Sequence, residues 1–197
     1  MTQTTLKAHA AVTFGRFNVC TKAHLHAFSN FLKKFESLDV CVIDDFLDEN
    51  ASVPKAEHTP FYVQADAQQA KTTFQLSERL ELMRLSTTDL ASRYPLQVCT
   101  IRRPEYYILE FNERFPKSKY QLVFSSASNN DSQSFESIRN EYLPRILDRT
   151  QDTVDVEFIQ HVADIRKAAA IDPLVWRSIM VPSAYGYFVS IHGPERI

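Results

Sequence analysis

Short apolar runs alternate with polar and amphipathic stretches along most of the chain. Runs of this length that are rich in Val, Ile and Phe, and that end at polar or glycine residues, are typical of buried β-strands. Five segments follow this pattern and are predicted to be strands: Ala10–Phe14, Asp39–Asp44, Leu96–Ile101, Lys119–Phe124 and Thr153–Ile159.

Helical spacing separates these runs. Leu25, Phe28, Leu32 and Phe35 recur every three or four residues, which predicts a helix with one apolar face after the first strand. A second helix, with Leu80, Met83, Thr87 and Leu90 on one face, is predicted to have Ser77 as its cap. Further helices are predicted after Pro104, over Phe135–Leu147 with a kink or an early end at Pro144, over about Asp164–Ala170, and after Pro182 with Ser183 as its cap.

The segment from about Phe46 to Phe74 breaks this regular pattern. It shows little periodicity, carries many polar side chains and contains Pro54 and Pro60. We predict an irregular, lid-like excursion over about residues 46–74, because loops of that length are usually functional or mobile.

Strands that alternate with helices predict a doubly wound α/β fold with a five-stranded, mainly parallel sheet of Rossmann-like type. The 197 residues suit a single domain, 1–197. Ligands of open parallel sheets lie beyond the carboxyl ends of the strands, at the point where the strand order reverses. This rule directs attention to the turn after Phe14, the loop after Phe124 and the segment after Ile159.

Composition narrows the functional classes. A formal net charge of −2 gives no general attraction to nucleic acid, so nucleic acid is not an expected partner. No apolar run approaches the roughly 20 residues of a membrane helix, and the first residues lack the features of a secretory signal. Cys20, Cys41 and Cys99 are widely spaced and match neither a disulfide framework nor a zinc site, which predicts reduced thiols in a cytoplasmic protein.

Glycine is scarce. Only Gly15, Gly186 and Gly193 are present, whereas average usage of about 7% would give on the order of a dozen. Glycine-rich phosphate loops of the Walker and dinucleotide types are therefore excluded. The sequence also contains no nucleophile elbow, no HExxH motif and no CxxC pair. Gly15 stands alone at the end of the first predicted strand.

The turn after this strand carries the candidate chemistry. Gly15, Arg16, Phe17 and Asn18 are followed by Thr21 and His24 and then by the first amphipathic helix. Glycine lets a ligand approach the backbone, and the N-terminus of a helix favours phosphate. The Thr21 hydroxyl and the His24 imidazole are spaced so that both can face one anion. The alternative is a plain connecting turn in which His24 caps the helix or packs.

These six residues match, in order and spacing, the pattern GRFNPPTxGH, a form of the (H/T)xGH signature. The chain thus resembles the nucleotidyltransferase superfamily, and within it archaeal-type nicotinamide-mononucleotide adenylyltransferases and their phage-encoded relatives. Val19-Cys20 replaces the proline pair and Ala23 replaces the motif glycine. Ala70–Leu90 and Asp172–Gly193 resemble further family segments, so the similarity extends over the whole chain.

The resemblance implies a role for each matched residue. Thr21 and His24 would polarise the triphosphate with the help of Arg166, and Mg²⁺ would arrive with the nucleotide, without a metal site of protein ligands. Active family members carry a form of ISSTxxR after the fifth strand, where Gln160–Arg166 keeps the arginine and lacks the hydroxyls. The residues expected to contact the nucleotide are Phe14, Gly15, Arg16, Phe17, Asn18, Ser126 and His161.

Two functional hypotheses follow. The first is transfer of an adenylyl or cytidylyl group from a nucleoside triphosphate to a small phosphorylated acceptor, such as nicotinamide mononucleotide, with release of pyrophosphate. The second is a catalytically degenerate domain that serves as a binding or structural component, for example of a phage virion. The expected location is the cytoplasm, or the virion in the second case. The sequence leaves homo-oligomers and assembly partners open for both.

Overall fold

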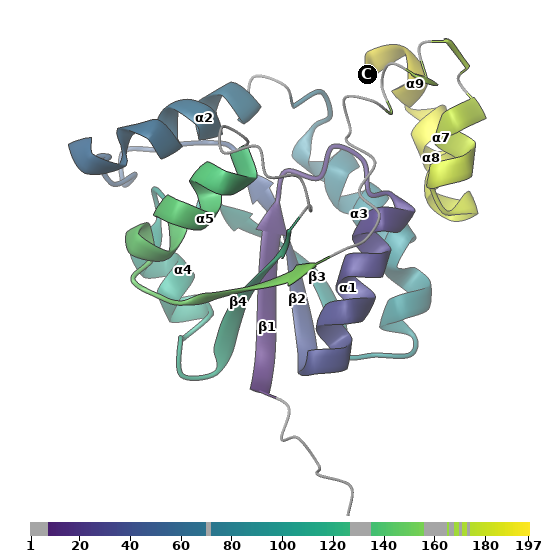
Figure 1. Cartoon of the computed structure of the whole chain (residues 1–197). Coiled ribbons are helices and arrows are strands. Elements are labelled where there is room, and N and C mark those ends of the chain that lie inside the picture. Colours follow the sequence, from purple (N-terminus) through teal and green to yellow (C-terminus); the bar gives the residue numbers. More distant parts are fainter. Residues whose placement is uncertain are drawn as a thin grey trace, which may run out of the picture.

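A five-stranded, all-parallel sheet forms the centre of the protein (Figure 1). The computed structural model describes residues 8–69, 72–126, 135–155, 165, 168–169, 171–172 and 174–197. The strand order is β3-β2-β1-β4-β5, so the order reverses between β1 and β4. This arrangement confirms the predicted doubly wound α/β fold. The strands are β1 (Ala8–Gly15), β2 (Phe35–Asp44), β3 (Leu96–Arg102), β4 (Tyr120–Ser126) and β5 (Gln151–Asp155).

Helices cover both faces of the sheet (Figure 1). Helices α1 (Lys22–Lys34) and α3 (Leu76–Ala91) pack on one face, and α4 (Ile108–Arg114) and α5 (Phe135–Ile146) pack on the other. The strands supply both cores because successive side chains point to opposite faces. Ala11 faces the α1 and α3 side, whereas its neighbour Val12 faces the other side, and both are fully buried.

The C-terminal helices lie beside α3 (Figure 1). They are α7 (Leu174–Ile179), α8 (Pro182–Ser190) and α9 (Gly193–Arg196). Trp176 and Phe188 form an apolar cluster with Val19, from the turn after β1, and with Phe74, from the segment before α3. The C-terminal part of the chain therefore supports the turn that carries the candidate chemistry.

Several predicted boundaries move in the structure. Phe35 begins β2 instead of extending α1, but its ring stays in the same core cluster. The N-cap of α3 is Gln75, whose backbone N–H donates to Glu78, so the prediction for Ser77 is wrong. Val181 caps α8, while the Ser183 hydroxyl donates to the Leu85 carbonyl.

Other predicted boundaries shift or cannot be compared. Pro104 lies in a turn, and α4 begins four residues later, at Ile108. Helix α5 continues through Pro144. Residues 156–159 of the fifth predicted strand lie outside the described residues, as does most of the helix expected over 164–170.

The prediction of an irregular excursion over residues 46–74 is wrong in its middle part. This segment contains a 3-10 turn, η1 (Ala56–His58), and an eleven-residue helix, α2 (Thr59–Gln69). Phe61, Tyr62 and Ala65 of this helix are buried, and α2 packs against α5. The apolar residues Phe61, Tyr62 and Val63 are consecutive and Val63 is exposed, so the segment shows little helical periodicity, and Pro60 fits the first turn of a helix as well as it fits a loop.

A buried charge cluster fixes α2 to the rest of the fold. Arg103, which is 1% exposed, pairs with Asp66 of α2 at 2.7 Å and with Glu105 at 2.8 Å. The Tyr62 hydroxyl donates to the Glu105 backbone carbonyl at 2.9 Å, and the Arg103 guanidinium lies 4.5 Å from the centre of the Tyr106 ring. Tertiary ion pairs of this kind leave no signal in hydrophobic periodicity.

Loss of Arg103 is expected to destabilise the protein strongly. In Arg103→Met the buried Glu105 carboxylate loses its partner, which should lower the free energy of unfolding by about 3–5 kcal/mol. Urea unfolding followed by circular dichroism measures this change. The matched control is Arg145→Met, since the pair of Arg145 with Glu141 is exposed and should contribute about 0–1 kcal/mol. Equal losses in the two variants would contradict the structural role of Arg103.

Candidate functional site

The turn after β1 is built around the ring of Phe17. A side-chain carbon added at Gly15 would lie 3.1 Å from this ring, so the space left by the glycine is taken by Phe17 and is not open to a ligand. Phe17 has a φ of 44°, in the left-handed region that non-glycine residues rarely adopt. Its ring makes edge-to-face contacts with His24 and Phe28 of α1. Aromatic packing thus holds a strained turn against the first helix.

Thr21 and His24 form a direct pair at the start of α1. Thr21 is the N-cap, and its backbone N–H donates to Nδ1 of His24 at 3.1 Å. The Thr21 hydroxyl lies 3.0 Å from the same nitrogen. The arrangement is an imidazole version of the capping box, in which the third helical residue satisfies the N–H of the cap. The predicted pair is therefore brought together, and in this structure its members bind each other.

This contact selects the tautomer of His24. Nδ1 accepts a hydrogen bond from a backbone N–H, so the proton of the neutral ring lies on Nε2. Burial lowers the pKa of His24 to about 4 from its usual 6.5, which keeps the imidazole neutral at pH 7. Among the described residues Nε2 has no hydrogen-bond acceptor. The ring can therefore offer one neutral N–H donor at the N-terminus of a thirteen-residue helix.

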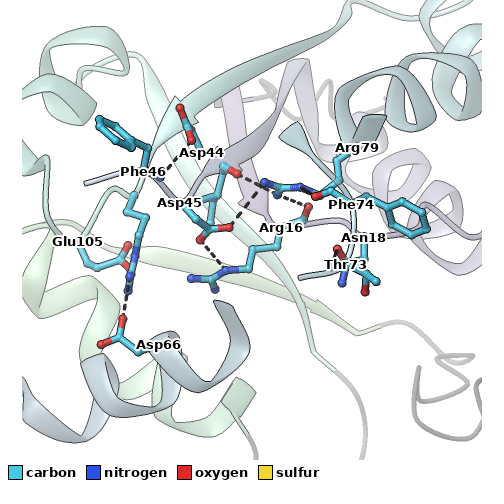
Figure 2. A network of polar contacts seen from close by, with 12 residues as sticks. Arg16, Asn18, Asp44, Asp45, Phe46, Asp66, Thr73, Phe74, Arg79 and Glu105 are labelled. Atoms are coloured by element: carbon cyan, nitrogen blue, oxygen red, sulfur yellow. Dashed lines mark hydrogen bonds and ion pairs between the residues drawn. The ribbon is translucent and has the colours of Figure 1, made fainter. Parts of the chain in front are cut away.

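Arg16 lies in an ion network beside the turn. Its Nε donates to Asp45 at 2.8 Å, and Nη2 of Arg79 lies 3.6 Å from the same carboxylate. Figure 2 shows the Asp45 carboxylate between the two guanidinium groups. Nη2 of Arg16 is buried and has no hydrogen-bond partner within the described part of the chain. The Asp45 carboxylate thus joins the two guanidinium groups, and the charge of Asp44 also acts on Arg79.

Arg79 fixes the position of this network. Its Nη1 donates to the backbone carbonyls of Arg16, at 2.8 Å, and of Ile43, at 2.9 Å, and its Nε donates to that of Phe74. The side chain is 3% exposed. Sequence reasoning missed Arg79 and Asp45, because each gains its role from partners that are distant in the chain. The only available signal was the resemblance of the segment Ala70–Leu90, which contains Arg79, to a further family segment.

The remaining predicted residues of the β1 end are distributed between core and turn. Phe14 packs edge-to-face on Phe111 and Phe124, in the core beneath the turn. Asn18 accepts a hydrogen bond from the Thr73 backbone N–H through Oδ1, which ties the turn to the segment before α3. Figure 2 shows Asn18 and Thr73 side by side.

The candidate residues of the other two segments are only partly placed. Ser126 is the last residue of β4, the strand next to β1, so its backbone lies at the point where the strand order reverses. His161 and Arg166 lie outside the described residues. In the part of the chain that is described, no hydrogen bond or ion pair joins the Arg16 guanidinium to the Thr21–His24 pair.

Within the described ranges of the chain, no group of three or more His, Cys, Asp or Glu side chains is arranged to hold a metal ion. Every helix described is too short or too polar to span a lipid bilayer.

Comparison with known proteins gives no assignment. The chain matches no protein-family model and no curated protein. Support for a function therefore comes from the motif residues and from their geometry in the fold.

The half-buried His24 is expected to make stability depend on pH. Because its pKa is lowered by burial to about 4, the unfolded chain binds a proton between pH 6.5 and 4 that the folded chain rejects. This contribution is present in full above about pH 6.5 and is lost as the pH falls toward 4. The expected loss is about 1–3 kcal/mol.

Urea unfolding of wild type and His24→Gln between pH 7.5 and 4 tests this expectation. Glutamine keeps the capping geometry at this position and does not titrate, so the variant should lose less stability on acidification than the wild type. His26→Gln, on the exposed side of the same helix, is the matched control and should keep the wild-type dependence. Parallel curves for wild type and His24→Gln would show that His24 is not held as a neutral imidazole in the folded protein.

Proposed function

We propose that this protein is a nucleotidyltransferase. It transfers an adenylyl or cytidylyl group from a nucleoside triphosphate to a small phosphorylated acceptor, such as nicotinamide mononucleotide, and releases pyrophosphate. The observation that supports this proposal best is the Thr21–His24 pair at the junction of β1 and α1. It combines the motif residues, the N-terminus of a helix and the reversal point of a parallel sheet in one place.

Phosphate is the ligand chemistry that fits these groups. The Nε2–H of His24 is a neutral donor, and the first turn of α1 adds backbone N–H groups and the positive end of the helix dipole. Arg16 adds a guanidinium with a buried nitrogen that lacks a hydrogen-bond partner among the described residues. Donors of this kind bind an anion without needing to lose or gain a proton themselves.

In the proposed reaction a phosphate oxygen of the acceptor attacks the α-phosphorus of the nucleotide, and the bond to pyrophosphate breaks. The protein contributes by positioning the reactants and by stabilising the negative charge that develops on the leaving group. His24 would donate a hydrogen bond to a phosphate oxygen throughout. Mg²⁺ bound to the triphosphate would supply further charge neutralisation, and it needs few protein ligands.

The alternative is a domain that binds a phosphorylated ligand without turning it over. Asp45 favours this alternative, because its carboxylate is bound to both Arg16 and Arg79 and reduces the positive charge available to a triphosphate. The lack of hydroxyls at Gln160–Ala163 favours it too. A binding or structural role, for example in a phage particle, would need only the fold and the anion site.

Removal of the His24 donor is expected to impair turnover. With ATP or CTP, Mg²⁺ and nicotinamide mononucleotide, the wild type should release pyrophosphate. His24→Ala should lower kcat by about 100-fold, as is typical for loss of one preorganised donor to a developing anion. An enzyme-coupled pyrophosphate assay measures the rate, and calorimetry measures nucleotide binding in parallel. His26→Ala, on the same helix, is the matched control and should keep the wild-type rate.

The two hypotheses differ in outcome. Nucleotide binding without pyrophosphate release, with any of several phosphorylated acceptors, would favour the binding domain. Absence of binding of either triphosphate at millimolar concentration would overturn the nucleotidyltransferase proposal. Circular dichroism of each variant verifies that the loss of activity does not come from unfolding.

A further inference from the structure

Two cysteines that are 58 residues apart in sequence lie beside each other in the sheet. Cys41 of β2 and Cys99 of β3 are direct register partners on neighbouring parallel strands. Their Sγ atoms are 3.3 Å apart, and one thiol donates a hydrogen bond to the other. Neighbouring strands are about 4.8 Å apart, which lies within the Cα separation of roughly 4.4–6.8 Å that disulfides span.

The two thiols differ in exposure and in acidity. Cys41 is fully buried, and burial raises the pKa of its thiol well above the usual value. Cys99 is half-buried on the edge strand. The hydrogen bond from Cys41 lowers the pKa of Cys99, and the positive charge of Arg114 adds to this effect, whereas burial and Asp39 oppose it. Cys99 is therefore the more exposed and the more acidic of the two thiols, and Cys41 Sγ lies next to it.

Arg114 is held close to this pair by its own contacts. Its Nη1 donates to the backbone carbonyl of Thr100, the residue after Cys99, at 2.7 Å. A cation next to a partly exposed cysteine is the environment in which thiolates form and react.

We propose that Cys41 and Cys99 form a reversible disulfide by thiol exchange with small disulfides of the glutathione type. The Cys99 thiolate attacks one sulfur of the small disulfide, which breaks the S–S bond and releases one small thiolate. Cys41 Sγ then attacks Cys99 Sγ, its proton passes to solvent, and the second small thiolate leaves. In total, two protein thiols and one small disulfide give one protein disulfide and two small thiols.

Cys20 provides a control within the same chain. It is 1% exposed, burial raises its pKa to about 12, and its Sγ contacts the Thr21 carbonyl at 4.0 Å and not another thiol. Cys20 should therefore remain reduced under conditions that oxidise the pair.

The experiment is incubation of the native, fully reduced protein with millimolar glutathione disulfide, followed by acid quenching. The number of free thiols, measured after unfolding, should fall from three to one. Peptide mapping without reduction should find Cys41 linked to Cys99, and dithiothreitol should restore three thiols. The oxidised protein should keep its circular dichroism spectrum and melt at a temperature no lower than that of the reduced form.

Two variants test the order of the steps. Cys41→Ser should stop at a mixed disulfide between Cys99 and glutathione, whereas Cys99→Ser should lose no thiol during the same incubation. Any of three results would overturn the proposal. They are three free thiols remaining in the wild type, glutathione retained on Cys99 without a link to Cys41, and a disulfide that includes Cys20. Mapping of the wild type gives a decision even if a variant fails to fold.

Discussion

The guanidinium of Arg79 enters the molecule from the first turn of α3 and donates to the backbone carbonyls of Arg16, Ile43 and Phe74. These carbonyls belong to the turn after β1, the end of β2 and the segment before α3. An unpaired buried carbonyl or guanidinium would cost on the order of 1–3 kcal/mol or more, so all three segments are fixed relative to one buried group. The Asp45 carboxylate balances part of its charge. Arg79, which lies outside the turn after β1, thus fixes the backbone of this turn.

Aromatic packing completes this support from the other side. Phe17 accepts a left-handed backbone conformation because its ring fills the space over Gly15 and contacts His24 and Phe28. A side chain at Gly15 would therefore crowd the Phe17 ring, apart from any role of the glycine toward a ligand. The C-terminal helices add a third support, since their apolar cluster includes Val19 of the same turn. Residues from both ends of the chain consequently determine the geometry at the start of α1.

The sequence was sufficient for the features that depend on local pattern. Runs such as Asp39–Asp44 lie in the sheet because Val and Ile suit buried strands, and strands that alternate with helices require a parallel sheet. The sequence was not sufficient for features that depend on tertiary contacts between distant residues. Helix α2 has only three buried apolar residues and is fixed by the ion pair of Asp66 with Arg103. The proximity of Cys41 and Cys99 likewise follows from strand register and not from spacing in the chain.

One hydrogen bond links the folding of the candidate site to its chemistry. The Thr21 N–H is a free donor at the start of α1 until Nδ1 of His24 accepts it. The same bond leaves the ring proton on Nε2, and a protonated ring would have to give up the bond because Nδ1 would then carry a hydrogen. Burial disfavours the protonated form as well. The capped helix and the neutral donor for an anion are therefore two consequences of one contact. His24→Gln keeps the cap and removes the imidazole, whereas His24→Ala removes both.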